Sequence, residues 1–263
     1  MTNPIYTKQE LIRKLIEIRD LGWVQNRRPN NAGGIGNTIE DLLGIAENNL
    51  PLPNSAEWEL KCHRASSGSL TTLFHSEPSP RALNIVPSML LPKYGWKHEK
   101  AGIIYPESEM SFRQTINSLS RTDRGFGVVV DRSENKVIVS FDSSKVSPRH
   151  FDWLESVRKK VGDVDELRPQ PYWGITDLVH VAGTKLLNCF YISADVKKES
   201  GKEFYNYTSI KMLKRFSEDK FIEGIENGLV LVDFDARTGH NHGTKFRIRE
   251  DKIPELYEDV TVI

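Results

Sequence analysis

The stretch GGIGNTIEDLLGIAENNLPLPNSAEWELK, residues 33–61, contains two successive patterns with different periods. Residues 38–48 place apolar side chains at helical spacing, so we expect a helix there, after a glycine- and asparagine-rich loop over residues 27–37. Pro51 and Pro53 end this helix, because proline cannot continue it and biases the preceding residue toward extended backbone. Residues 56–63 then alternate in character, which predicts a strand.

The predicted strand separates its polar and apolar side chains onto two faces. Successive side chains of a strand point in opposite directions. One face therefore carries Glu57, Glu59, Lys61 and His63. The other face carries Trp58, Leu60 and Cys62, which we expect to point into a hydrophobic core.

A carboxylate two residues from a lysine on one strand face is the chemical centre of many nucleases. The carboxylate holds a divalent cation that polarises the scissile phosphate and lowers the pKa of a bound water. The lysine orients that water and offsets the charge that builds on phosphorus. Mg²⁺ suits this site because it keeps several waters and needs only one or two carboxylates. Glu59 and Lys61 are weak evidence alone, and Glu40 on the preceding helix is a further candidate carboxylate.

The rest of the chain mixes helices and strands, which favours an α/β fold with a central mixed sheet flanked by helices. Thr7 and Glu10 predict a capped helix over residues 7–21. Further helices are expected over residues 150–161, 174–184 and 217–227. Strands are expected over residues 70–74, 125–130, 136–141, 186–196, 202–210, 229–234 and 244–248. The strand over residues 70–74 is the candidate partner of the strand over residues 56–63. Residues 76–125 are otherwise expected to be irregular.

Composition limits the classes of protein that the chain fits. The 263 residues include 36 basic and 36 acidic side chains, so the formal net charge is zero and any nucleic-acid binding must come from charge sorted onto one face. Two cysteines provide neither a disulfide framework nor a zinc pattern. The N-terminus lacks a signal-peptide core, and no long apolar run predicts a membrane span. We therefore expect a cytoplasmic protein.

A second polar block near the C-terminus suits base recognition. His240, His242 and Arg247 follow Asp233 and Asp235, which share a face of the preceding strand. Imidazole and guanidinium groups donate to guanine, and a carboxylate accepts from cytosine, so these residue types can distinguish C·G pairs. The two histidines could instead bind zinc, although further ligands are missing nearby, or the block could be a plain polar hairpin.

The chain resembles the MvaI/BcnI restriction endonucleases, which belong to the PD-(D/E)XK superfamily and are related to the mismatch-repair nickase MutH. The resemblance rests on residues 33–61 and on HNHGTKFRI, residues 240–248, with weaker support from residues 185–209 and 224–237. It implies a monomeric, Mg²⁺-dependent enzyme with two lobes around a DNA cleft, which cleaves short C/G-rich pseudopalindromic sites. It also implies that Asp233, His240, His242 and Arg247 read the DNA.

The chain departs from the family pattern at two positions. The family places an aspartate after the proline of the catalytic motif, where this chain has Asn54. An amide is a weaker ligand for a hard cation than a carboxylate. Asn54 is either an engineered change, a natural one compensated by Glu40 or Glu57, or the mark of a protein that binds DNA without cutting it. The family's arginine two residues after Asp233 is replaced by Asp235, and Arg237 is a candidate substitute.

These patterns predict a type II restriction endonuclease with Glu59, Lys61, Asn54 and Glu40 at the catalytic site and Asn54, Glu59 and Glu40 as Mg²⁺ ligands. The predicted DNA-reading residues are Asp233, Arg237, His240, His242 and Arg247. We expect residues 1–165 to form mainly the catalytic lobe and residues 166–263 mainly the recognition lobe. A strand-nicking enzyme and a catalytically silent DNA-binding protein are the alternatives. The predicted partners are double-stranded DNA and a cognate DNA methyltransferase encoded nearby. No association with a membrane is expected.

Overall fold

The computed structural model describes residues 6–29, 33–45, 58–65, 68–162 and 166–263. The chain divides into two compact units. Unit 1 comprises Met1–Thr71, Val181–Lys220 and Arg249–Ile263, and unit 2 comprises Thr72–His180 and Phe221–Ile248. The units therefore interleave along the chain, whereas the sequence prediction divides it once, near residue 165.

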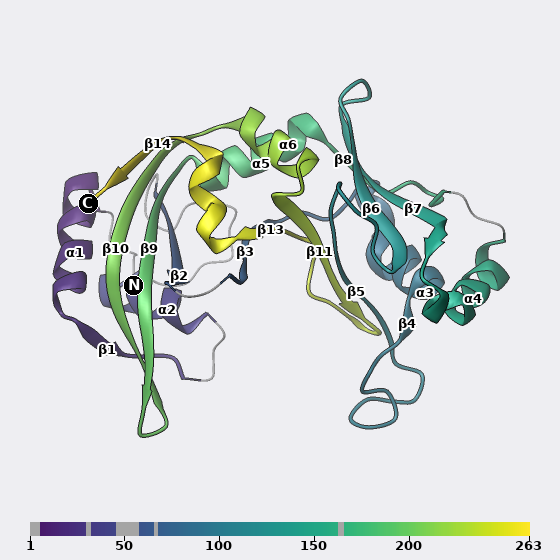
Figure 1. Cartoon of the computed structure of the whole chain (residues 1–263), viewed down its shortest axis with the longest axis horizontal. Helices are drawn as coiled ribbons and strands as arrows, with labels where there is room; N and C mark the ends of the chain where they lie inside the picture. The colour runs from purple at the N-terminus through teal and green to yellow at the C-terminus, as the bar shows by residue number, and fades with distance from the viewer. Residues whose placement is uncertain (1–5, 30–32, 46–57, 66–67, 163–165) are drawn as a thin grey trace. The chain divides into compact units, whose positions relative to one another are not determined.

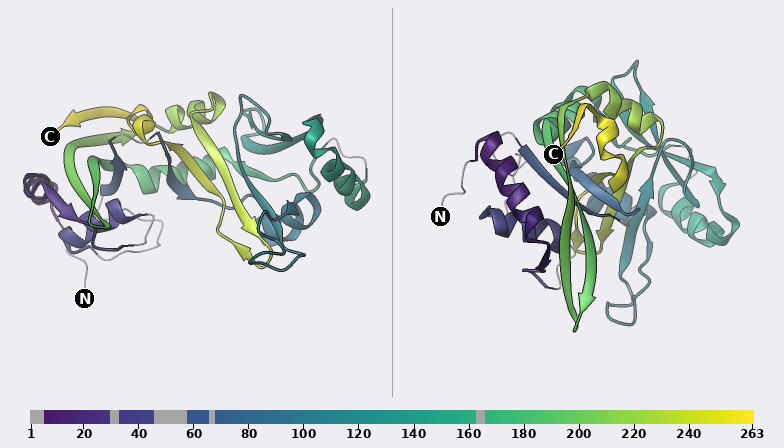
Figure 2. Two further views of the ribbon diagram at one scale, coloured as in Figure 1. Left: turned by 60° about the horizontal axis from the view of Figure 1, so that its bottom comes forward. Right: turned by 60° about the vertical axis from the view of Figure 1, so that its left-hand side comes forward.

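Unit 1 is built on a mixed sheet in the order β1-β10-β9-β2, with β14 also paired to β10 (Figure 1). Its strands are β1 (Trp23–Gln25), β2 (Trp58–Arg64), β9 (Asn188–Glu199), β10 (Lys202–Phe216) and β14 (Tyr257–Val262). Its helices are α1 (Lys8–Asp20), α2 (Gly34–Leu43) and the 3-10 segment η4 (Glu250–Leu256). β9 and β10 form the long antiparallel hairpin that Figure 2 shows from two further sides. β2 joins β9 in parallel.

The hydrophobic core of unit 1 lies where α1 and α2 meet this sheet. Thr7 caps α1 in a reciprocal capping box with Glu10, as the sequence predicts. Leu11, Leu15 and Ile18 then face the core together with Ile35, Ile39 and Leu43 from α2. Trp58 and Leu60 of β2 belong to the same cluster, and Cys62 packs against it. The predicted division of β2 into two faces is thus confirmed.

Two sequence predictions in this region are wrong. The helix expected from residue 38 begins at Gly34, inside the predicted loop, and ends at Leu43, where Gly44 adopts a left-handed backbone conformation with φ 71°. The close approach of Tyr205 and Asn26 leaves no room for a Cβ atom at Gly34, so here glycine marks packing rather than a loop. The strand β3 (Leu70–His75) pairs with β13 in another sheet and not with β2.

Unit 2 contains two sheets, ordered β3-β13-β11-β5-β4, with β12 paired to β11, and β6-β7-β8. Their remaining strands are β4 (Trp96–Lys97), β5 (Met110–Ile116), β6 (Arg124–Asp131), β7 (Lys136–Val146), β8 (Tyr172–Gly174), β11 (Val230–Arg237), β12 (His240–Asn241) and β13 (Lys245–Arg249). The helical segments are η1 (Arg81–Leu83), η2 (Val86–Leu90), α3 (Leu91–Tyr94), η3 (Pro148–His150) and α4 (Phe151–Val161). The predicted hairpin of β6 and β7 and the predicted helix α4 are confirmed.

Aromatic side chains fill the interior of unit 2. Phe112 of β5 lies against Phe126 and Phe234, with ring centroids 5.3 and 5.4 Å apart. Phe74 stacks on Phe246 at 5.1 Å. Buried aromatic rings each remove a large apolar area from water, so these contacts stabilise the packing of β5 against β6 and β11, and of β3 against β13.

The irregular segment expected over residues 76–125 contains the central strand β5, so that prediction is wrong. β5 reads MSFRQTI, and its buried apolar side chains are Phe112 and Ile116. The polar side chains between them obscure the alternation that predicts a strand. Two helices, α5 (Ile175–Leu186) and α6 (Glu218–Glu226), contribute residues to both units. Within the described chain, none of the helices combines the length and apolar character needed to span a membrane.

Candidate functional site

A buried carboxylate with two lysines lies at the start of β2 in unit 1. Glu59 is 2% exposed. Its Oε1 lies 2.9 Å from Lys61 Nζ, and its Oε2 lies 3.0 Å from Lys185 Nζ. The structure therefore brings together the predicted pair, Glu59 and Lys61, and adds a lysine that the sequence analysis did not single out.

The parallel pairing of β2 with β9 explains how Lys185 reaches this site. Parallel strands begin at the same edge of a sheet, and here Glu59 lies opposite Cys189 in register. Lys185 occupies the last turn of α5, three positions before β9 begins. The turn into β9 thus carries Lys185 to the edge at which β2 starts.

Lys61 is held as a cation. Burial by itself lowers the pKa of Lys61, but the adjacent Glu59 carboxylate and its hydrogen bond outweigh burial, and the pKa is raised above its ordinary value. Glu40 on α2 also favours the charged form of Lys61 through its negative charge. An ammonium group that retains its proton at neutral pH can orient a nucleophile and offset developing charge, but it is not a general base.

Of the other candidate ligands, the structure describes Glu40 only. Glu40 is half-buried on α2, and its charge acts on Lys61 and Cys62. Asn54 and Glu57 lie outside the described residues. Among the residues that the structure describes, no three His, Cys, Asp or Glu side chains gather as a metal-ligating group, so the zinc alternative for His240 and His242 gains no support.

The described donor set nevertheless fits a hard divalent cation. Glu59 supplies a buried carboxylate whose Oε2 accepts no hydrogen bond from the described residues, although it lies within ion-pair distance of Lys185. Carboxylate oxygen is the ligand that Mg²⁺ prefers. Glu59 is thus positioned to contribute one ligand; of the two other predicted ligands, Glu40 lies on α2 and Asn54 lies outside the described residues.

His63 shares the strand face of Glu59, but its side chain packs against Tyr191 and Ser193 of β9. Its ring stacks on Tyr191 with centroids 4.4 Å apart, and its Nε2 lies 2.5 Å from Ser193 Oγ. Burial lowers the pKa of His63. These contacts favour the structural interpretation of His63.

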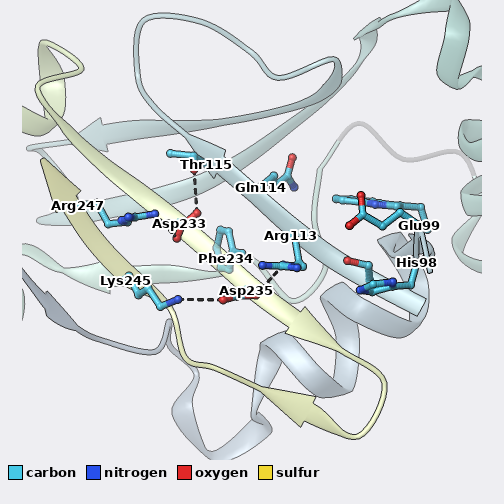
Figure 3. Close-up of a pocket in the computed structure, with 12 residues that line it drawn as sticks. His98, Glu99, Arg113, Gln114, Thr115, Asp233, Phe234, Asp235, Lys245 and Arg247 are labelled. Carbon is cyan, nitrogen blue, oxygen red and sulfur yellow. Dashed lines mark hydrogen bonds and ion pairs between the residues drawn. The ribbon is translucent and has the colours of Figure 1, made fainter. Parts of the chain in front are cut away.

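Unit 2 carries a polar pocket of about 460 Å³ over the strands β5, β11 and β13 (Figure 3). Asp233 and Asp235 project into it from β11, as expected for residues two apart on a strand. Thr115 and Arg113 lie directly opposite them on β5. Lys245 and Arg247 lie on β13, on the other side of β11. Three adjacent strands therefore present alternating acids and bases on one face.

Each aspartate in the pocket is held from both sides. Asp233 accepts from Thr115 Oγ1 at 2.8 Å and from Arg247 Nη1 at 3.1 Å. Asp235 lies 2.7 Å from Arg113 Nε and 3.0 Å from Lys245 Nζ. Burial acts to raise the pKa of Asp235, but its bond to Lys245 and the neighbouring positive charges outweigh burial and lower it. Both carboxylates are fixed in place as acceptors.

The other predicted recognition residues, Arg237, His240 and His242, do not line this pocket, although the backbone N–H of His242 donates to the Asp235 carbonyl oxygen at 3.0 Å. Arg237 is outside the pocket lining; it donates to Glu109 Oε1 at 2.9 Å and lies over the Tyr105 ring. His240 and His242 are exposed, with their ring nitrogens Nε2 and Nδ1 3.3 Å apart. The sequence analysis missed Arg113, Thr115 and Lys245. The signal that could have found them is the spacing of two residues along a strand, which places Arg113 with Thr115 on β5 and Lys245 with Arg247 on β13.

The Glu59–Lys61 pair on a mixed sheet and the polar pocket of unit 2 fit the restriction endonuclease that the sequence predicts. The chain belongs to the MvaI/BcnI restriction endonuclease family, whose model matches residues 12–257. The predicted family and the predicted α/β fold are both confirmed.

Two solved structures of a member of the family are similar to the whole chain. A complex of the restriction endonuclease MvaI with cognate DNA substrate is 27% identical, with a TM-score of 0.77 and 98% of this chain and 99% of that chain covered. The restriction endonuclease MvaI in the absence of DNA is also 27% identical, with a TM-score of 0.55 and full coverage of both chains. No curated protein matches the chain.

Proposed function

We propose that the protein is a type II restriction endonuclease that hydrolyses phosphodiester bonds at a short, C/G-rich pseudopalindromic site in double-stranded DNA. The observation that carries this proposal is the buried Glu59–Lys61 pair in a chain of this family. The DNA complex of the similar endonuclease supports double-stranded DNA as the partner. A monomer and a cognate methyltransferase, which protects the host's own sites, complete the proposal.

The catalytic residues act through charge and position. Glu59, with Asn54 and Glu40 as further candidate ligands, would hold Mg²⁺, and the bound cation would supply a polarised phosphate and an acidified water. Lys61, kept protonated by Glu59, orients the attacking water and offsets the negative charge that develops on phosphorus. Because Lys61 is largely buried, its charge acts in a poorly hydrated environment and is screened less than on the surface.

The polar pocket of unit 2 suits direct reading of C·G pairs. Arg113 contacts Asp235 through Nε, which leaves the guanidinium end available for the two acceptors of guanine, O6 and N7. Arg247, beside Asp233, is the second candidate donor to guanine. Asp233 and Asp235 are the candidate acceptors for the amino group of cytosine. His240 lies on the short strand β12, which pairs with β11, and His242 lies in the loop that follows. Both remain candidates for additional base contacts.

We assign catalysis to unit 1 and recognition to unit 2. This assignment keeps the predicted division of labour between two lobes and replaces its boundary near residue 165 with the limits of the compact units. Glu59, Lys61 and Lys185 all belong to unit 1, while every residue that lines the polar pocket belongs to unit 2.

Incubation of the protein with supercoiled plasmids and Mg²⁺ tests this function. A restriction endonuclease yields discrete linear fragments, whose ends give the target site when sequenced. Open circles alone would support a strand-nicking enzyme. A gel shift with intact DNA would identify a silent DNA-binding protein, which is the alternative that Asn54 motivates.

A further inference from the structure

Lys185 is a third charged group at the catalytic carboxylate, and its position is built into the fold. Its side chain is 16% exposed, the same fraction as that of Lys61. It extends from the last turn of α5, where the carbonyl groups at a helix C-terminus favour a positive charge. The parallel register of β2 and β9 then fixes the end of α5 beside Glu59. Two cations therefore meet the two oxygens of one carboxylate.

A divalent cation that binds Glu59 must enter this arrangement. Lys61 Nζ and Lys185 Nζ lie 2.9 and 3.0 Å from the carboxylate oxygens. A metal ion on either oxygen would lie close to at least one of these ammonium groups, and like charges a few ångströms apart repel strongly when they are shielded from water. Lys185 lies within ion-pair distance of Oε2, the carboxylate oxygen that accepts no hydrogen bond from the described residues and could also bind a metal. The ammonium group of Lys185 and a metal ion compete for the same atom.

We propose that Lys185 is a positioning residue that orients Glu59 and weakens cation binding until DNA is present. In the free protein, Lys185 forms an ion pair with Oε2, and its positive charge opposes the binding of a metal ion to Glu59. A DNA phosphate brings negative charge that offsets Lys61 and Lys185, so the cation binds tightly only to the complex. This inference rests on the proposed nuclease function and adds a coupling between the substrate and the metal.

The coupling is tested by cation binding to the protein without DNA. Titration calorimetry with Mn²⁺ is carried out on the full chain and on Lys185→Gln, which keeps a hydrogen-bonding group but removes the charge. The free variant should bind Mn²⁺ about tenfold or more tightly than the parent, because one repelling charge is gone. Adding DNA should then raise the affinity of the variant less than that of the parent.

Two further variants separate charge from structure. Lys185→Arg retains the positive charge and should keep the weak Mn²⁺ binding of the free parent. Lys14→Gln removes an exposed lysine on α1 that pairs with Glu17, and it should leave both Mn²⁺ binding and cleavage unchanged. The melting temperature of each variant shows whether the fold survives.

Equal Mn²⁺ affinity of the free parent and Lys185→Gln would overturn the proposal. If Lys185→Gln does not fold, the Mn²⁺ affinity of the parent is compared with and without DNA. Equal affinities would contradict the coupling. A parent that binds DNA but never binds Mn²⁺ would instead contradict the metal-dependent nuclease. The failure of this inference and the failure of the proposed function therefore give different results.

Discussion

Arg247 Nη1 lies 3.1 Å from Asp233 Oδ2 and joins the neighbouring strands β13 and β11 diagonally. In register, Asp233 faces Lys245, and Arg247 faces Leu231. The other oxygen of Asp233 accepts from Thr115 on β5, so one carboxylate connects three strands. Such a network holds both donor and acceptor in fixed positions before DNA arrives, which lowers the entropic cost of recognition.

Arg247→Ala should reduce the preference for the cognate site. A bidentate arginine–guanine contact contributes about 1–3 kcal/mol of discrimination, and that amount should be lost in a binding competition between cognate and random DNA. Arg132→Ala is the matched control, because Arg132 pairs with Glu226 away from the pocket and should leave discrimination unchanged. Unaltered discrimination by Arg247→Ala would exclude Arg247 from base reading.

Arg113→Lys should relax specificity without loss of charge. Lysine preserves the positive charge beside Asp235 but lacks the planar fork that donates to two acceptors at once. Cleavage of a randomised DNA library should therefore tolerate more bases at one position of the site. The salt dependence of nonspecific DNA binding should stay the same, since the number of charges is unchanged. A library profile identical to that of the parent would contradict the assignment.

Lys61→Gln should abolish most of the cleavage while DNA binding persists. Removing a charge that stabilises a transition state costs about 10²–10³ in rate. Single-turnover cleavage measures this loss, and a gel shift with Ca²⁺ in place of Mg²⁺ measures binding.

The raised pKa of Lys61 also affects the stability of the fold. The charged form of Lys61 should stabilise the folded state at neutral pH, and this contribution should be lost only as the pH rises above the ordinary lysine value of 10.5.

Asn54→Asp should increase Mg²⁺-dependent cleavage. A carboxylate is a stronger ligand than an amide for a hard cation, so we expect a gain of about tenfold or more. Initial rates of plasmid cutting across a range of Mg²⁺ concentrations provide the measurement. An unchanged rate at every concentration would show that position 54 is not the defective ligand, and it would favour compensation by Glu40 or Glu57.

His63 should make the stability of the fold sensitive to mild acid. Burial lowers the pKa of His63 below its ordinary value of 6.5, so the unfolded chain takes up a proton more readily than the folded one. Neutral His63 contributes fully to the free energy of unfolding above pH 6.5. This contribution is lost as the pH falls through the lowered pKa of His63 in the folded state. Urea denaturation between pH 5 and 7.5 should therefore show a smaller decline for His63→Gln than for the parent.

Most helices and strands could be predicted because local patterns determine them. Thr7 and Glu10 mark the start of α1, and the alternation around Glu59 identifies β2. The strand β5 was missed because Gln114 stands between Phe112 and Ile116 on the same strand face, so three polar residues follow one another and the alternation is broken. The pairing of β3 with β13 was missed because strand partners far apart in sequence leave no local signal.

The candidate site divides in the same way. Glu59 and Lys61 are two residues apart, so strand geometry alone predicts that they share a face. Lys185 is distant in sequence and reaches Glu59 through the parallel pairing of β2 with β9. Arg237 is a different case: its spacing from Asp233 made it a candidate, but it contacts Glu109 and Tyr105 and does not line the pocket, so its role in reading DNA stays a prediction.

The interleaving of the two units restricts how new specificities can arise. Unit 1 is assembled from three chain segments and unit 2 from two, so a single crossover between related genes would exchange parts of both. A single crossover that transfers the whole of unit 2 therefore also transfers Val181–Lys220 of unit 1, which includes Lys185. Under the proposed division of labour, we expect new specificities to arise by point substitutions on the pocket face of β5, β11 and β13, and laboratory libraries aimed at new targets should begin at those positions.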